Sequence, residues 1–181
     1  MVISTSSINR RKGSINRRNG SISREWEVAA SVLDPEVPVL TIEDLGILRD
    51  VRADPDGVTV TITPTYSGCP AMDAIRQDIE AAFALAGRDD VRVETVLAPA
   101  WTTDWITEDG RRKLEEFGIV PPQPRRDLDK LDQPVMLTLS LRCPQCGSPD
   151  TRELSHFGST ACKSLWVCSS CREPFDHFKS L

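Results

Sequence analysis

Residues 58–87 read VTVTITPTYSGCPAMDAIRQDIEAAFALAG, and this stretch decides the fold of the first region of the chain. In its first half, valine and isoleucine alternate with threonine, which is the period of a half-buried strand, and Pro64 ends the pattern. From Pro70 to Gly87 the apolar residues recur at three- and four-residue spacing, which predicts an amphipathic helix. A strand that leads into a helix in this way predicts a small domain of the α/β (α+β) class.

Cys69 stands at the junction between this strand and this helix. Unpaired N–H groups and a partial positive charge at a helix N-terminus favour a thiolate, so we predict a lowered pKa for Cys69. Cys69 is therefore the first candidate for a reactive or cluster-handling residue. The alternative is a buried cysteine that serves only as a small apolar side chain, and the local sequence leaves both interpretations open.

The loop before the strand, LDPEVPVLTIEDLGIL at residues 33–48, places four carboxylates among apolar residues and two prolines. These acids are Asp34, Glu36, Glu43 and Asp44. Carboxylates in an ordered loop can bind a metal or a cluster, or they can accept hydrogen bonds from backbone N–H groups of the turn. For Asp34, which precedes a proline, capping of the turn is the preferred interpretation.

The elements on either side follow from local patterns. We expect a short helix over residues 24–33, a strand over 45–53 that ends in a DPDG turn, and a third strand over 91–97 that includes Leu97. The four-residue spacing of Trp101 and Trp105 predicts that both cover the core.

A last helix of the first region is expected after Thr107, which can cap its N-terminus. Leu114 and Phe117 are predicted to face inward, and Gly118 to end the helix. This element completes the first domain.

The charge of the chain is divided unevenly. The 181 residues carry a formal net charge of −5, yet residues 1–24 hold six basic residues and no acid, which leaves 16 basic and 27 acidic residues in the remainder. The tail contains the tandem repeat SINRRKG and SINRRNG at residues 7–20, with too few apolar residues for a coiled-coil seam. We predict a disordered tail; a transit peptide, a contact with nucleic acid or anionic lipid, and no function at all are the alternatives.

Four of the six cysteines form two CxxC pairs near the C-terminus. CPQCG at residues 143–147 and CSSC at 168–171 are separated by 21 residues. This spacing is typical of a zinc ribbon, in which Cys143, Cys146, Cys168 and Cys171 hold a structural zinc ion in a closed tetrahedral site. Iron in a rubredoxin-like site is the lesser alternative, because four thiolates also suit iron.

Three further residues of this region remain after the metal ligands are assigned. Cys162 is a spare thiol that is either structural or reactive, and the sequence does not decide between the two. His156 and His177 are expected to be surface or packing residues, because four cysteines already complete the site.

These patterns divide the chain into four parts. We predict a disordered basic tail over residues 1–24, a small α/β domain over 25–120, a proline-rich linker over 121–133 and the zinc ribbon over 134–181. The ribbon is expected to open with a strand that alternates from Val135 to Leu141.

The cysteine pattern and the hydropathy predict a protein of a reducing cellular compartment. No apolar run approaches the length of a bilayer and no signal-peptide core is present, while CxxC pairs that bind metal are typical of reducing conditions. We expect a cytoplasmic protein with no membrane partner. A nucleic-acid partner is also not expected, because residues 134–181 carry five basic and four acidic residues and lack a basic surface.

Longer stretches resemble known families. LDPEVPVLTIEDLGIL at residues 33–48 and TPTYSGCPAMDAI at 63–75 are similar to the SufT-like iron-sulfur assembly factors. APAWTTDWIT at residues 98–107 and FGSTACKSLWVCSSCREPFDHFK at 157–179 resemble the PaaD (PaaJ) family of bacterial phenylacetate degradation. The resemblance runs from about residue 26 to the C-terminus; the repeated basic tail and Ser180, where the family has a cysteine, depart from it.

The resemblance implies an accessory subunit of the ring 1,2-phenylacetyl-CoA epoxidase rather than an enzyme. Its implied role is maturation or delivery of an iron-sulfur or di-iron metallocluster, with Cys69 as the motif cysteine and Asp34 and Glu36 in the matching loop. The implied partners are the oxygenase and iron-sulfur reductase subunits. A transient iron-sulfur cluster at Cys69 would have to be shared with a second copy in a homodimer or with a partner, because one cysteine cannot supply four ligands.

Two other classes of function compete with this one. A cysteine enzyme would need a base beside Cys69, and the first domain contains no histidine. A non-catalytic adaptor that holds oxygenase and reductase subunits together uses the same ribbon and needs no chemistry at Cys69, so the sequence leaves this alternative open.

Overall fold

The computed structural model describes residues 23–66, 68–123 and 141–180. The predicted tail up to residue 22, the linker from residue 124 onward and most of the strand predicted to begin at Val135 lie outside these ranges. Of that strand only Leu141 is described, and it is buried. None of the described helices combines the length and the hydrophobicity that crossing a lipid bilayer requires.

The first sheet has three strands in the order β1-β2-β3. β1 (Leu48–Asp54) runs antiparallel to β2 (Gly57–Ile62), and β3 (Val91–Thr95) runs parallel to β2. Along β2, Val58, Val60 and Ile62 are buried while the two threonines between them are only partly buried. The predicted alternation is therefore confirmed, and β2 is the central strand of the sheet.

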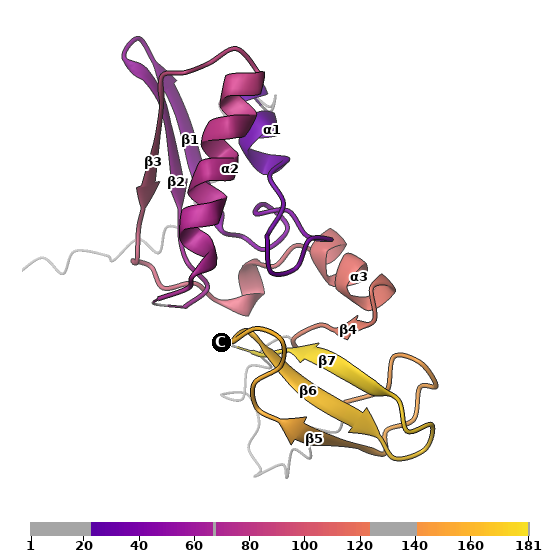
Figure 1. Cartoon of the computed structure of the whole chain (residues 1–181). Coiled ribbons are helices and arrows are strands. Elements are labelled where there is room, and N and C mark those ends of the chain that lie inside the picture. The colour runs from indigo at the N-terminus through magenta and orange to yellow at the C-terminus, as the bar shows by residue number, and fades with distance from the viewer. Residues whose placement is uncertain (1–22, 67, 124–140, 181) are drawn as a thin grey trace, which may run out of the picture.

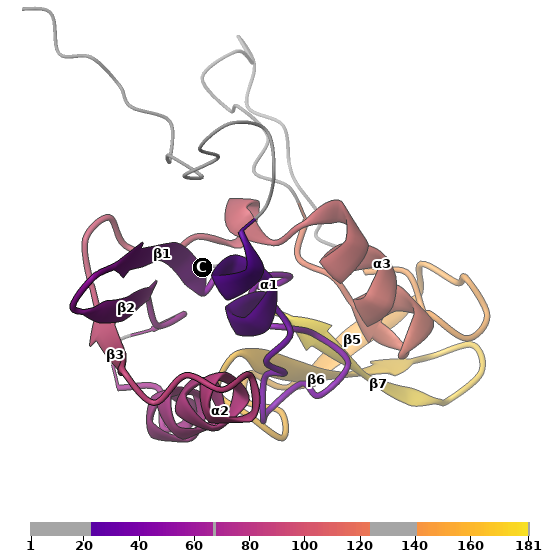
Figure 2. The same cartoon turned by 90° about the horizontal axis from the view of Figure 1, so that it is seen from above.

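Two helices, α1 (Arg24–Ala30) and α2 (Ala71–Leu85), cover one face of this sheet (Figures 1 and 2). α2 buries Ala71, Ile75, Ile79 and Phe83. It ends at Leu85, with Ala86 as its C-cap. The predicted stop, Gly87, follows with a φ of 82° in the left-handed region, and the N–H of Arg88 donates to the carbonyl oxygen of Phe83 at 2.9 Å. The central strand and helix of the α/β fold thus follow directly from the local sequence.

The last helix of the first region, α3 (Glu108–Glu116), also starts where it was predicted to start. The hydroxyl of Thr107 accepts a hydrogen bond from the N–H of Gly110 at 2.9 Å, and Leu114 is fully buried. Lys113 donates to the carboxylate of Asp44 at 2.8 Å, which ties α3 to the acidic loop. The Thr107 cap therefore fixes the start of α3, and the ion pair holds the helix against the acidic loop.

The second sheet has four strands in the order β4-β7-β6-β5. β5 (Thr151–Ser155), β6 (Lys163–Cys168) and β7 (Pro174–Phe178) form an antiparallel ribbon, and β4 (Ile119–Val120) adds to β7 in parallel. β4 directly follows α3 and Gly118. The chain therefore enters the sheet of the ribbon before it reaches the proline-rich segment.

The ribbon and the first region share one apolar core. Cys162 and Phe178 belong to the same buried cluster as the sheet and helices of the first region. The ring of Phe178 lies 6.3 Å from that of Trp101, whose indole N–H donates to the carbonyl oxygen of Leu45 at 2.9 Å. Figure 1 shows the N-terminal end of α2 directed toward the ribbon, and we call this boundary between the first region and the ribbon the junction.

Three expectations about individual residues differ from the structure. Leu97 was predicted inside the third strand, but β3 ends at Thr95, opposite the last residue of β2, and Leu97 is 66% exposed. Phe117 was predicted to face inward, but it forms the C-cap of α3, where the chain turns away, and is 58% exposed. Leu45 is buried as an apolar residue, but in the loop before β1 rather than in the strand.

Phe178 provides a test of the shared core. Phe178→Ala should lower the free energy of unfolding by about 3–5 kcal/mol, because a fully buried ring that contacts Trp101 is replaced by a cavity. Urea denaturation of the full chain measures this change. Phe157→Ala is the matched control, since Phe157 is 65% exposed and its removal should cost well under about 1 kcal/mol. Equal losses for the two variants would contradict the shared core.

Candidate functional site

The four cysteines of the two CxxC pairs lie together at one end of the ribbon. All pairs of their sulfur atoms are within 4.8 Å, with Sγ of Cys143 at 3.7 Å from that of Cys171 and Sγ of Cys146 at 3.6 Å from that of Cys168. A tetrahedral zinc site with Zn–S bonds of about 2.3 Å places its sulfur atoms about 3.8 Å apart. The spacing therefore fits zinc, and these four residues would hold it.

Backbone hydrogen bonds order the loop of each pair and favour the thiolate form of Cys168. The N–H of Gly147 donates to the carbonyl oxygen of Cys143, and that of Arg172 donates to the carbonyl oxygen of Cys168, both at 2.9 Å. A hydrogen bond from the backbone N–H of Cys171, with a smaller contribution from that of Ser170, lowers the pKa of Cys168 to about 6, although burial opposes the shift. A thiolate at neutral pH is the form that a metal binds.

The two histidines lie outside this cluster, as predicted. His156 is exposed and pairs with Glu153 at 3.2 Å. His177 packs edge-on against Trp166, and burial lowers its pKa to about 4, so it stays neutral. Neither imidazole is among the groups that could hold a metal in the described residues.

The second candidate site begins in the acidic loop, where Asp34 caps a turn. One carboxylate oxygen of Asp34 accepts hydrogen bonds from the N–H groups of Glu36 at 2.9 Å and Val37 at 2.7 Å. Asp34 is buried, and burial raises its pKa although these two hydrogen bonds oppose the shift. The capping interpretation is confirmed for Asp34, and its effect is to fix the backbone at Glu36 and Val37.

Glu36 contacts one of the two cysteines outside the CxxC pairs and influences the pKa of both. Its Oε2 is 3.7 Å from Sγ of Cys162, which comes from the ribbon. Burial and then the charge of Asp34 raise the pKa of Glu36. The negative charge of Glu36 in turn raises the pKa of both Cys69 and Cys162. Glu36 is therefore coupled electrostatically to one thiol from each region.

Cys69 lies just before α2, half-buried against the core. Burial raises its pKa, the backbone N–H of Ala71 lowers it, and the charges of Glu36 and Asp34 raise it again. The net shift is upward, so the predicted lowering of this pKa is wrong. The helix N-terminus acts in the predicted direction, but burial and two nearby carboxylates outweigh it.

Alkylation of Cys69 tests this balance of charges. In full-length protein to which no iron has been added, Glu36→Gln should lower the pKa of Cys69, because a negative charge that opposes the thiolate is removed. A lower pKa means more thiolate at pH 8, so the rate with iodoacetamide should rise several-fold, at about tenfold per pKa unit. Peptide mass spectrometry follows Cys69 separately from Cys162, whose pKa of about 11 and burial keep it slow.

Asp73→Asn is the control for this measurement. Asp73 is an acid in the first turn of the same helix, but its side chain is 86% exposed and it is not among the groups that shift Cys69. Its loss should leave the rate unchanged. An unchanged rate in Glu36→Gln as well would show that Glu36 does not act on Cys69.

The other two acids of the loop are used within the fold. Glu43 accepts a hydrogen bond from the indole N–H of Trp26 at 2.9 Å. Asp44 accepts hydrogen bonds from Thr41, Thr107 and Lys113, which joins the loop to α3. Neither residue therefore remains a candidate ligand.

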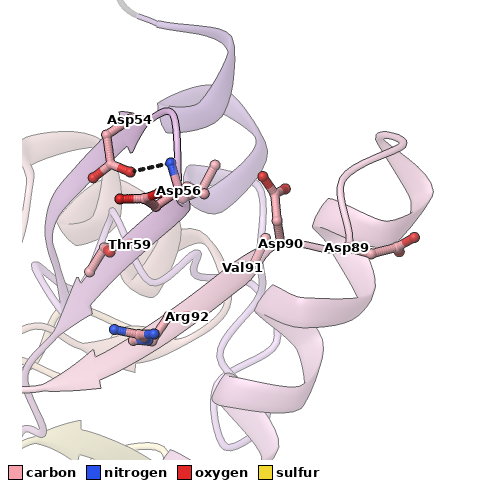
Figure 3. A pocket seen from close by; sticks show the side chains of 9 residues that line it. Asp54, Asp56, Thr59, Asp89, Asp90, Val91 and Arg92 are labelled. Carbon is pink, nitrogen blue, oxygen red and sulfur yellow. Dashed lines mark hydrogen bonds between the residues drawn. The ribbon is translucent and has the colours of Figure 1, made fainter.

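A pocket of about 380 Å³ lies at the opposite end of β2 from Cys69. Figure 3 shows that its acids come from the turn between β1 and β2 and from the start of β3. Asp54 accepts a hydrogen bond from the N–H of Asp56 at 3.0 Å, and Asp90 pairs with Arg88 at 2.8 Å. Asp54 stabilises the turn and Asp90 forms a surface ion pair, and no cysteine lines this pocket. The candidate iron-binding residues therefore lie at the junction and not in this pocket.

Comparison with known proteins agrees with this two-part architecture. Residues 130–179 match the family model described as PaaD zinc beta ribbon domain, and residues 27–95 match the model described as iron-sulfur cluster assembly protein. One subunit of the "Putative 1,2-phenylacetyl-CoA epoxidase" of Escherichia coli (strain K12) is 47% identical over 156 residues, covering 86% of this chain and 91% of that protein. The chain belongs to the PaaD family.

Two further similarities of this PaaD family member fall in its first region. An "Fe-S protein maturation auxiliary factor" of Porphyromonas gingivalis (strain ATCC BAA-308 / W83) is 36% identical over 86 residues, covering 46% of this chain and 81% of that protein. A crystal structure of a domain of unknown function, DUF59, from Bacillus anthracis is 26% identical, covers 50% of this chain and 87% of that chain, and has a TM-score of 0.46.

Two features of the junction were not predicted from the sequence. Tyr66, three residues before Cys69, has its pKa raised to about 12 by burial and by interactions with Cys69, Glu36 and Cys162. The approach of Cys162 to Glu36 was also missed, because 126 residues separate them in the sequence. The only local signal was that Cys162 is a cysteine outside the CxxC pairs.

Proposed function

We propose that this chain is an accessory subunit of a 1,2-phenylacetyl-CoA epoxidase and acts in the maturation or delivery of an iron-sulfur or di-iron metallocluster. Three findings support this: the 47% identity to a protein named as a subunit of that epoxidase, the match of residues 27–95 to an iron-sulfur assembly model, and the similarity to a maturation factor. The partners would be the oxygenase and iron-sulfur reductase subunits.

Cys69 and Glu36 would bind the iron cargo, and Asp34 would hold Glu36 in position. The observation that carries this assignment is the half-buried Cys69 thiol, electrostatically coupled to the carboxylate of Glu36, whose backbone the Asp34 cap fixes. A thiolate and a carboxylate are both iron ligands. The raised pKa of Cys69 means that binding must displace a proton, so the thiol would stay neutral until cargo arrives.

The proposed role is accessory rather than catalytic. The side chains that shift the pKa of Cys69 are those of Tyr66, Glu36 and Asp34, none of which is an imidazole. Both histidines of the chain lie in residues 151–180, in the ribbon. An activated cysteine nucleophile normally has a depressed pKa or an imidazole partner, whereas the pKa of Cys69 is raised. All six cysteines are free thiols, which suits the cytoplasm, and a homodimer would be one way to complete the ligand set of a cluster.

Anaerobic reconstitution tests this function directly. Full-length protein is incubated with ferrous iron and sulfide, freed of excess reagents, and mixed with the apo form of the epoxidase reductase or oxygenase. We expect a chromophore that depends on Cys69, followed by recovery of activity in the acceptor. Failure to bind iron, or binding without any transfer to either acceptor, would count against a maturation role.

A further inference from the structure

Cys162 belongs to the ribbon, yet its side chain faces the first region. The residue directly precedes β6, is only 4% exposed, and is part of the core cluster that contains α2 and the first sheet. Its Sγ lies 3.7 Å from Oε2 of Glu36. A second thiol is thus brought to the carboxylate that is already coupled to Cys69.

The ribbon holds this thiol firmly in place. The carbonyl oxygen of Cys162 accepts a hydrogen bond from the N–H of Lys179 at 2.9 Å, and its Sγ lies 3.0 Å from the hydroxyl of Thr160. The neighbouring Lys163 is buried and pairs with Asp176 at 3.6 Å. The position of Cys162 therefore depends on the folded ribbon.

We propose that Cys162 supplies a second thiolate to the iron cargo, so that the cargo site is built across the junction from Cys69, Glu36 and Cys162. This inference rests on the proposed function and adds the ribbon to its ligand set. Two thiolates and one carboxylate form a donor set suited to iron or another borderline-soft metal, and they leave room for a ligand from the acceptor protein. The ribbon then contributes directly to cargo binding in addition to its own structural metal.

The three donor atoms of the junction are less tightly gathered than the four sulfur atoms of the ribbon site. Within the described residues, only the four ribbon cysteines form a set of three or more ligands whose atoms all lie within 4.8 Å of one another. Since Oε2 of Glu36 and Sγ of Cys162 are already 3.7 Å apart, Sγ of Cys69 lies farther from at least one of them, and binding of a single metal ion would draw it closer. A site that closes only around its cargo can release that cargo, whereas a closed four-cysteine site holds its metal. The two sites would thus have different tasks.

Cobalt(II) provides the test, because its bonds to thiolates absorb in the near ultraviolet. Cobalt chloride is titrated anaerobically into the zinc-loaded full chain, and zinc content is followed to show that the ribbon keeps its own metal. We expect a charge-transfer band that falls to about half in Cys162→Ala and in Cys69→Ala, and to nothing in the double variant, because each residue supplies one of two thiolates.

Ser164→Ala is the matched control, since Ser164 is a buried residue two positions further along whose hydroxyl lies 3.3 Å from Nδ1 of His177. Its band should equal that of the wild type. A full band in Cys162→Ala together with no band in Cys69→Ala would overturn the role of Cys162 and leave the proposed function standing. No band in the wild type would overturn both.

A second measurement uses the unaltered chain and so does not depend on how Cys162→Ala folds. Phenylarsine oxide bridges two thiols that can approach each other. In the zinc-loaded protein we expect a single arsenical that joins the peptides of Cys69 and Cys162, detected by mass spectrometry after digestion. Modification of neither thiol, or arsenic on ribbon cysteines alone, would overturn the shared site.

Discussion

Cys143→Ser is expected to remove both the zinc and the fold of the ribbon. A structural zinc ion contributes on the order of 10 kcal/mol to the folding of such a module, which is more than a ribbon of this size can replace. The sheet β1-β2-β3 with α1 and α2 should remain folded, because its own strands and helices supply most of the core. Its stability should nevertheless fall, since Phe178 no longer packs against Trp101.

Elemental analysis and amide hydrogen exchange measure the two parts of this prediction. Cys143→Ser should contain no zinc and lose exchange protection in β6 and β7 while protection in α2 persists. Ser169→Ala is the control, because Ser169 lies between two zinc ligands but uses only its backbone N–H, which donates to Asp150. A Cys143→Ser protein with one zinc per chain and a protected β6 would show that the ribbon does not need this ligand.

Cys69→Ala is expected to abolish most of the epoxidase activity of cells in which it is the only copy. The substitution removes a ligand from the cargo site but little volume, so the fold should lose only about 1 kcal/mol. Mutation of a residue that only hydrogen-bonds to a metal ligand lowers metal affinity or activity by about 10- to 100-fold, and loss of the ligand itself should lower it at least as much. Activity should therefore fall by about tenfold or more while the subunits still assemble.

This experiment separates a maturation factor from an adaptor. An adaptor would tolerate Cys69→Ala, because it needs surfaces and not a thiol. Asp73→Ala, an exposed change in the first turn of the same helix, should retain full activity and controls for effects on the helix. Full phenylacetyl-CoA epoxidase activity in the Cys69→Ala strain would remove the maturation role from this residue.

Local patterns predicted most of the elements because their causes are local. The alternation at Val58, Val60 and Ile62, the left-handed Gly87 and the Thr107 cap each act within a few residues, and each lies where the sequence placed it. The two CxxC pairs also predicted the metal site, since tetrahedral coordination restricts the spacing of the ligands in the sequence. The predictions for Leu97 and Phe117 were wrong because the point at which a strand or helix ends depends on the elements packed beside it.

The sequence alone thus determined the α/β core and the zinc ribbon, and it marked Cys69 as a candidate functional residue. Only the tertiary structure decided the chemistry of that thiol, because its pKa depends on burial and on carboxylates 33 and 35 positions away as well as on its own helix. The meeting of Cys162 with Glu36 and the pairing of β4 with β7 likewise join residues that are distant in the chain. Such contacts arise when two apolar surfaces bury each other, and no pattern within a few residues encodes them.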